Sequence, residues 1–274
     1  MCPLLTEEMK SAWIYHEIAQ AKTQTRYISP DDSILRCLEN SVKPHANDMM
    51  VELGCGSGLR SLYLAKKHSL EPVLIDYTRF GVSLTKDNAE KLGVSCHIVR
   101  CDLKHLPFRN EIFDIVWAEG IHEHMLIGDR PLAFDETRRI ARSGAQLLIL
   151  VPNFLNPIYR IEEMIKGKFH VAELYEIPFP RSDLAYWIRR SGFTVTGREG
   201  LEVFYTLFTY STINLTDMPP IIRPLYRIKR FITRSCHSRN GIMSYTIQIL
   251  RRLDRNILPQ TMLGHEIGVV AVAN

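Results

Sequence analysis

The chain has 274 residues, of which 46 % are hydrophobic and 23 % charged, and its formal net charge is +4. This composition is typical of a globular protein with a substantial core, and it excludes a disordered or fibrous chain. The acidic N-terminus lacks the apolar stretch of a signal peptide, and no run approaches the ~20 apolar residues that cross a bilayer. The six cysteines form no C-x-x-C pair, which favours free thiols. We therefore expect a cytoplasmic protein.

Short apolar runs alternate with helical patterns through the first half of the chain. A polar helix is expected over Glu8–Lys22. The helices that follow are expected over Asp32–Val42, Leu59–His68, Phe80–Leu92 and Pro131–Ala141. The strands are expected over Met49–Leu53, Pro72–Ile75, Ser95–Arg100, Phe113–Trp117 and Gln146–Val151. Such an alternation predicts a parallel sheet with helices on both faces.

The rhythm changes after residue 152. A helix is expected over Ser182–Ser191, capped by Ser182 and Asp183, and a sixth strand begins at Phe193. A seventh strand is expected over Ile267–Val272. About sixty residues separate these last two strands, far more than the roughly 2–6 of an ordinary connection, so Leu201–Leu263 is predicted to be a helical insertion.

The segment 50–58 reads M-V-E-L-G-C-G-S-G and joins a predicted strand to a predicted helix. A glycine turn at this place exposes backbone N–H groups to a nucleotide-like ligand. A dinucleotide-binding turn would need glycine at Leu59. The spacing E-x-G-x-G-x-G instead resembles motif I of the class I S-adenosylmethionine (SAM)-dependent methyltransferases.

Three further segments carry the same resemblance. Asp76 ends the second predicted strand, where the family has an acid that binds the ribose hydroxyls; an acid there also suits NAD. The segment 102–116, with D-L-K-H-L-P-F followed by F-D-I-V, is similar to that of ubiquinone/menaquinone-type and small-molecule methyltransferases, in which the aspartate and the next N–H bind adenine. Residues 139–151 resemble the end of a helix, the turn and the fifth strand of the family, although A-R-S-G-A replaces the usual L-K-P-G-G of the turn.

The resemblance, which covers roughly Met49–Val151 and loosely Asp183–Arg198, implies a Rossmann-like α/β fold with a seven-stranded, mostly parallel sheet. With the N-terminal helices and the helical insertion predicted above, we expect a single domain made of a lid (1–45), a SAM-binding core (46–200), a basic cap (201–263) and the last strand (264–274). The residues that the resemblance implies for cofactor binding are Glu52, Gly54, Cys55, Gly56, Gly58, Asp76, Tyr77, Asp102, Leu103 and Glu119.

The loop 119–124 reads E-G-I-H-E-H and is expected beside the reactive methyl group. His122 or His124 is a candidate general base, because histidine titrates near neutral pH. The alternative is that this is the family's ordinary turn and that the histidines are structural. Two imidazoles are too few for a metal site, so no metal is predicted.

The insertion is strongly basic. Residues 218–255 contain nine Lys and Arg residues and one acid, Asp254. Within 221–234, isoleucines and leucines fall on one helical face and arginines on a neighbouring one. This pattern fits a cap with a solvated basic face, a grip on anionic lipid, or a cap over a phosphate-bearing substrate. Few aromatic residues are interleaved, which argues against a nucleic-acid partner.

The sequence thus predicts methyl transfer from SAM to a small-molecule or lipid-linked acceptor, with O or C favoured over N because no [DN]-P-P-[YF] motif is present. Two alternatives stay open. One is a non-catalytic SAM-fold binding or scaffold protein, and the other is an NAD-dependent oxidoreductase. The protein is expected in the cytoplasm, with peripheral attachment to the inner face of a membrane if the basic cap binds lipid.

Overall fold

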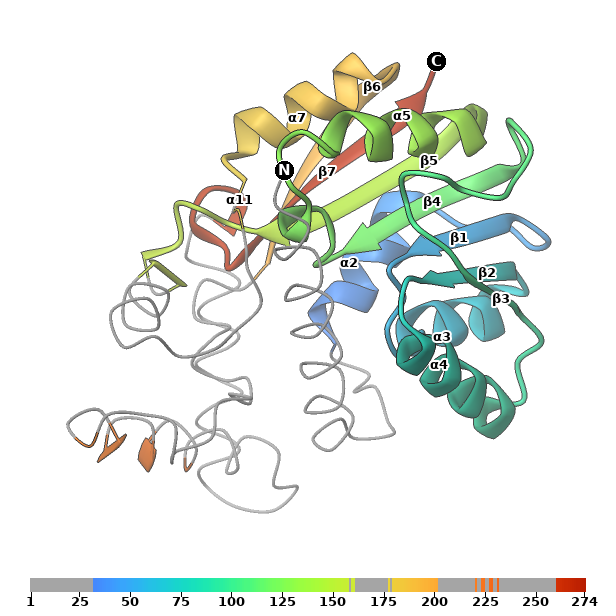
Figure 1. Cartoon of the computed structure of the whole chain (residues 1–274), viewed down its shortest axis with the longest axis horizontal. Coiled ribbons are helices and arrows are strands. Elements are labelled where there is room, and N and C mark those ends of the chain that lie inside the picture. The colour runs from blue at the N-terminus through green and yellow to red at the C-terminus, as the bar shows by residue number, and fades with distance from the viewer. Residues whose placement is uncertain are drawn as a thin grey trace.

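The computed structural model describes residues 32–157, 159–160, 177, 179–201 and 260–274, together with residues 220, 223, 224, 227, 228 and 231. The predicted helix Glu8–Lys22, most of the lid and most of the basic cap lie outside these residues. A seven-stranded sheet crosses the described part, with strand order β3-β2-β1-β4-β5-β7-β6 (Figure 1). All neighbouring strands are parallel except β7, which runs antiparallel to both β5 and β6. The predicted mostly parallel sheet is therefore confirmed.

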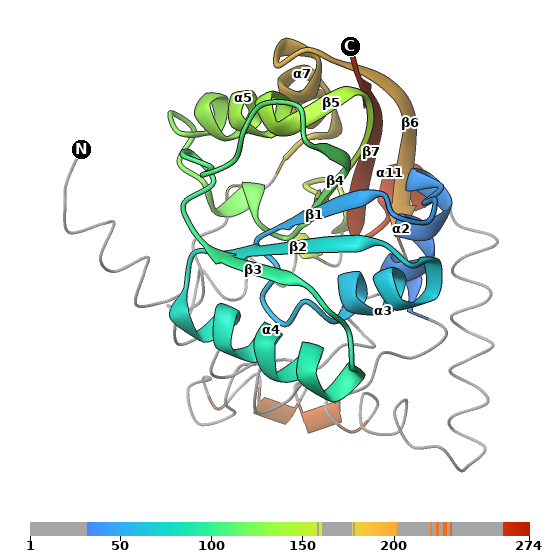
Figure 2. The same cartoon turned by 90° about the vertical axis from the view of Figure 1, so that its right-hand side faces the viewer.

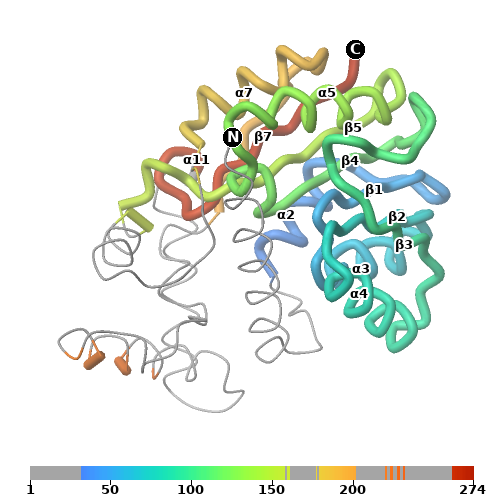
Figure 3. The backbone as a smooth tube through the Cα atoms, viewed as in Figure 1, coloured from blue at the N-terminus to red at the C-terminus, as the bar shows by residue number. Residues whose placement is uncertain are grey.

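The strands are β1 (Met49–Leu53), β2 (Glu71–Asp76), β3 (His97–Arg100), β4 (Phe113–Glu119), β5 (Ala141–Pro152), β6 (Phe193–Leu201) and β7 (Glu266–Ala273). The helices are α2 (Ser33–Val42), α3 (Leu59–His68), α4 (Arg79–Leu92), α5 (Arg130–Ile140), α7 (Arg181–Arg190) and the short α11 (Gln260–Leu263), with a 3-10 turn η1 (His122–His124). The trace in Figure 3 shows β7 running beside β5, and β6 pairs with the other edge of β7.

Helices cover both faces of the sheet (Figure 2). On one face, α2 and α3 pack against side chains such as Met50, Trp117 and Leu148, and α4 packs beside α3. On the other face, α5 and α7 pack against side chains such as Val116 and Ile149. Because both faces are buried, the central strands are continuous apolar runs, as the sequence predicted.

Local signals set most element boundaries. Asp32 caps α2, because its Oδ1 accepts a hydrogen bond from the amide of Leu35 at 2.7 Å. Gly93 ends α4 in the left-handed conformation, with φ of 62°. The expected cap of α7 is wrong: Pro180 occupies the cap position, the helix begins at Arg181, and no side chain caps it. Proline suits this place because its fixed φ is compatible with entry into a helix.

Strand β5 is longer than its apolar run predicted. Helix α5 ends at Ile140, β5 starts at Ala141, and no separate turn is formed. Gly144 adopts a φ of 82°, and the pairing with β4 shifts register between Phe113 and Ile115. The exposed residues before Ala145 therefore form a bulged extension of the strand, which hydrophobicity alone does not indicate.

Candidate functional site

A glycine turn joins β1 to α3. Gly54, Gly56 and Gly58 have φ angles of 72°, 51° and 64°, a region that residues with side chains rarely adopt. A Cβ on Gly54 would lie 2.8 Å from the side chain of Ile121, and one on Gly58 would lie 2.9 Å from that of Thr85. In the part of the chain that the structure describes, a Cβ on Gly56 would meet nothing within 4 Å. The first and third glycines therefore permit close packing, whereas the middle one presents bare backbone to open space.

Asp76, the last residue of β2, ties this turn to α4. Its Oδ2 accepts a hydrogen bond from the amide of Gly56 at 2.8 Å. Its Oδ1 accepts from both the amide and the hydroxyl of Thr78, each at 2.8 Å. Thr78 in turn accepts from the amide of Gly81 at 2.9 Å and caps α4. A carboxylate has about four acceptor positions, so roughly one remains for a ligand.

The turn after β3 carries Asp102 and Leu103. The amide of Cys101 donates to the carbonyl of Asp76 at 3.1 Å, which places this turn beside the end of β2. Asp102 Oδ1 accepts from the amide of Lys104 at 3.0 Å, and 38 % of the Asp102 side chain is exposed. Leu103 is buried and Tyr77 is exposed. The structure thus brings an accessible carboxylate and an accessible phenol to the edge where the glycine turn lies.

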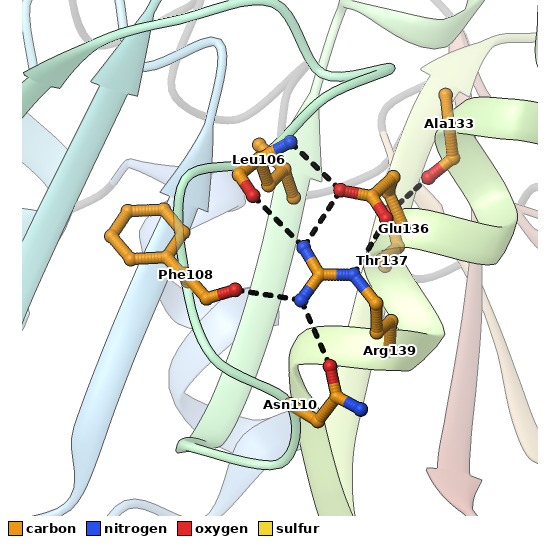
Figure 4. A network of polar contacts seen from close by, with 7 residues as sticks. All are labelled: Leu106, Phe108, Asn110, Ala133, Glu136, Thr137 and Arg139. Carbon is orange, nitrogen blue, oxygen red and sulfur yellow. Dashed lines mark hydrogen bonds and ion pairs between the residues drawn. The ribbon is translucent and has the colours of Figure 1, made fainter.

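An ion pair on α5 holds the rest of this loop (Figure 4). Arg139 donates from Nε and Nη2 to the two carboxylate oxygens of Glu136, at 2.6 and 2.8 Å. Its Nη2 also donates to the carbonyl of Leu106 at 2.9 Å, and its Nη1 to that of Phe108 at 2.6 Å. Glu136 accepts from the amide of Leu106 at 2.7 Å. The side chains of Arg139 and Glu136 therefore hold the L-P-F segment through its main-chain carbonyls and amide.

Arg60, in the first turn of α3, joins three elements. Its Nη1 donates to Glu119 Oε2 at 2.7 Å, and its Nε donates to Asp32 Oδ1 at 3.1 Å. Glu119 ends β4, and Asp32 precedes α2. The sequence analysis assigned Glu119 to the cofactor site but gave Arg60 no role, because no spacing rule indicates its two partners.

Two buried acids face the same side of the sheet as Glu119. Burial raises the pKa of Glu52 to about 8, opposed by a hydrogen bond from Ser61. Burial, and then the negative charge of Glu119, raises the pKa of Glu266 well above its usual range. One carboxylate oxygen of Glu52 and one of Glu266 have no hydrogen-bond partner. Burial therefore favours the protonated form of both acids.

The histidines of η1 are both buried. The ring of His122 lies 4.7 Å from that of Phe134, measured between centroids, and neither of its nitrogens is hydrogen-bonded. Burial, and then the charge of Arg130, lowers the pKa of His122 to about 3. Such a group is a weak base. His124 Nε2 lies 3.8 Å from the carboxylate of Glu123. A catalytic role for either histidine stays a prediction, and His122 is placed in the core against α5.

Asn153 and Asn156, just after β5, hold the segment that leads into β7. The side-chain amide of Asn153 donates to the carbonyls of Met262 and Gly264, at 2.9 Å each. That of Asn156 donates to Leu263 at 2.8 Å. Sequence reasoning missed these buried amides, whose partners are more than a hundred positions away. Among the residues described, no group of three or more His, Cys, Asp and Glu side chains is arranged to hold a metal ion.

Residues 51–149 match the family model of a methyltransferase domain. The chain carries a methyltransferase domain. The resemblance predicted from residues 50–58 and 102–116 is thereby confirmed. The chain is 30 % identical over 141 residues to the 27-O-demethylrifamycin SV methyltransferase of Amycolatopsis mediterranei (strain S699), a match that covers 48 % of this chain and 51 % of that protein. The chain spans about half, or less, of the length of the curated relatives it matches first.

Solved methyltransferase structures have the same fold. The geranyl diphosphate C-methyltransferase of Streptomyces coelicolor A3(2), in complex with Mg2+, geranyl diphosphate and S-adenosyl-L-homocysteine, aligns with a TM-score of 0.56 and 12 % identity over 89 % of this chain and 79 % of that one. A complex of the Haloferax volcanii Trm112 methyltransferase activator with a putative methyltransferase gives a TM-score of 0.59 and 13 % identity, with 97 % of both chains covered. The predicted Rossmann-like methyltransferase fold is therefore confirmed.

Proposed function

We propose that the domain binds SAM at the carboxyl edge of its sheet and transfers a methyl group to an oxygen or carbon atom of a small organic acceptor. The observation that carries this proposal is the bare backbone of Gly56, which faces open space beside the carboxylate of Asp76. A glycine at which a Cβ meets nothing, in a backbone conformation that residues with a Cβ rarely adopt, permits close approach of a ligand to the backbone. The names of some relatives, a demethylrifamycin SV methyltransferase and a tocopherol O-methyltransferase, support small-molecule methylation, whereas others are named probable tRNA methyltransferases.

The residues present fit this cofactor. We assign the ribose hydroxyls to Asp76 and Tyr77, the adenine to Asp102 and the amide of Leu103, and the amino-acid part to the turn near Glu52 and Glu119. Gly54 and Gly58 shape the turn. Cys55 contributes its backbone, since its thiol is buried against the hydroxyl of Thr85 at 3.3 Å. The bound cofactor supplies an already activated methyl group, so the protein mainly orients the reactants and excludes water.

Calorimetry with S-adenosylhomocysteine and with NADH tests this assignment. We expect S-adenosylhomocysteine to bind and NADH to give no heat, because the glycine spacing leaves no turn for a pyrophosphate. Binding of NADH with no response to S-adenosylhomocysteine would favour the oxidoreductase alternative. If S-adenosylhomocysteine binds but labelled SAM transfers no methyl group to any fraction of a cell extract, the scaffold alternative is favoured.

A membrane role for the basic segment is a second proposal, together with a lipid-linked acceptor and a location at the cytoplasmic membrane face. No helix in the described part of the chain combines the length and hydrophobicity needed to cross a bilayer. Ile228 and Phe231 are nevertheless 56 % and 61 % exposed, and Arg227 is also exposed. Exposed apolar and basic side chains on one segment suit the surface of an anionic membrane.

Flotation with vesicles tests this second proposal. Binding to anionic vesicles should exceed binding to neutral ones and should fall with salt, because each surface arginine contributes about 1 kcal/mol and is screened beyond about 8 Å. Replacing Arg223, Arg227, Arg230 and Arg234 by glutamine should abolish flotation and leave S-adenosylhomocysteine affinity unchanged. Equal behaviour with neutral and anionic vesicles would exclude the membrane role and leave a soluble acceptor.

A further inference from the structure

We infer that Arg139 and Glu136 are positioning residues for adenine recognition, and that they act by holding the loop that carries Asp102. This inference rests on the proposed function, because it assumes that Asp102 and Leu103 bind the adenine of SAM. Neither residue of the pair was assigned to the site from the sequence, and both lie on α5, outside the loop itself.

The first support is the number of hydrogen bonds that the guanidinium of Arg139 makes. Its guanidinium makes five hydrogen bonds: two to Glu136, one each to the carbonyls of Leu106 and Phe108, and one to the side chain of Asn110 at 3.1 Å. A planar fork of donors can satisfy such a set, and a lysine ammonium cannot reproduce it. Figure 4 shows the guanidinium at the centre of these contacts.

The second support is that Arg139 and Glu136 bind both main-chain polar groups of one loop residue, Leu106. The carbonyl of Leu106 accepts from Arg139, and the amide of Leu106 donates to Glu136. The two side chains therefore satisfy both main-chain groups of Leu106, as a neighbouring β-strand would. Because Leu106 follows the turn at Asp102 by four residues, its placement limits where that turn can lie.

The third support is that the turn is held at further points. Lys104 Nζ donates to Asp129 Oδ2 at 3.0 Å, at the start of α5. The amide of His105 donates to the carbonyl of Asp102 at 3.0 Å, which closes the turn. The rings of Phe108 and Phe113 pack edge to face, with 5.3 Å between centroids. The loop is thus fixed to α5 and β4 before any ligand binds, and a preformed site loses less entropy on binding.

The adenine-specific consequence can be measured without knowing the methyl acceptor. The probes are S-adenosylhomocysteine and its inosine analogue, in which a carbonyl replaces the 6-amino group. We expect the wild type to favour the adenine form by about 10²-fold or more, because Asp102 would face an acceptor in the analogue. In Arg139→Gln we expect affinity for S-adenosylhomocysteine to fall about tenfold to hundredfold and the preference to shrink to within about tenfold.

Matched variants separate positioning from general stability. Arg142→Gln removes the same charge three residues away, where Arg142 pairs with Asp114 at 2.6 Å and does not contact the loop; it should keep the wild-type preference. Arg139→Lys and Glu136→Gln are milder changes that serve if Arg139→Gln does not fold, and each should lower the preference. A merely structural role would weaken both ligands equally, so an unchanged preference in these variants would overturn the inference. No binding of S-adenosylhomocysteine by the wild type would instead overturn the proposed function.

Discussion

Replacing Gly56 by alanine should abolish binding of S-adenosylhomocysteine while lowering the free energy of unfolding by only about 1–2 kcal/mol. The stability cost comes from the φ of 51°, which disfavours any residue with a Cβ. The free protein has room for the methyl group, since nothing lies within 4 Å of it. The ligand would occupy that room, so we expect affinity to fall more than about 100-fold, or about 2.7 kcal/mol. Calorimetry and thermal unfolding measure the two effects separately.

Gly93 supplies the matched control for this change. It has a similar φ of 62°, and a Cβ there would also meet nothing within 4 Å, but it caps the far end of α4. Gly93→Ala should therefore cost similar stability and leave the affinity for S-adenosylhomocysteine unchanged. If Gly56→Ala binds as well as Gly93→Ala, the open face of the glycine turn is not the cofactor site.

The free energy of unfolding should be greatest near pH 4.5 and should fall on both sides. Glu52 has a pKa of about 8 in the folded protein against an ordinary value of 4.5, so the folded state holds the extra proton between these values and stability falls as pH rises. His122 has a folded pKa of about 3 against 6.5, so the unfolded state holds the extra proton and stability falls as pH decreases. Each group contributes at most about 1.4 kcal/mol per pH unit. Between pH 4.5 and 6.5 the slope from His122 opposes that from Glu52, and Glu266, whose pKa burial also raises, adds a further fall in stability as pH rises.

Denaturant unfolding across pH, on the wild type and two variants, measures these slopes. Glu52→Gln should reduce the loss of stability between pH 5 and pH 8, and the loss that remains is expected from Glu266. His122→Phe should remove most of the loss below pH 4.5. A wild-type curve that rises from pH 6.5 to 8 would show that Glu52 is ionised in the folded protein.

The boundaries of many elements could be predicted because they depend on local residues. The bounds expected for β1 and α3 are those observed, since an apolar run ends at a glycine turn and a helix follows. The end of α4 follows from Gly93. Strand β5 was predicted too short because the pairing of Ala141 with Phe113 of β4, rather than hydrophobicity, decides where it starts, whereas the pairing with β7 begins only at Gln146. Its exposed first residues carry no strand signal.

The candidate site also contains residues that local sequence could place and contacts that it could not. The glycine turn, Asp76 and Asp102 lie at strand ends that the sequence already located, and the structure brings them to one edge of the sheet. The pairing of Arg60 with Asp32 and Glu119 joins residues that are 28 and 59 positions apart, and that of Arg139 with Leu106 spans 33. Such contacts follow no period in the sequence, because they depend on how whole elements pack against each other.

The place of β7 has a consequence for the order in which the chain can fold during synthesis. Among the described strands, β6 pairs only with β7, and β7 also covers the outer edge of β5. About sixty residues separate β6 from β7, so β6 leaves the ribosome long before its partner. Until residues 266–273 arrive, β6 has no strand to pair with and β5 presents an open apolar edge, the kind of surface on which newly made chains aggregate. We therefore expect the yield of folded protein to depend on how well that edge is protected, by a chaperone or by local collapse, until β7 has been made.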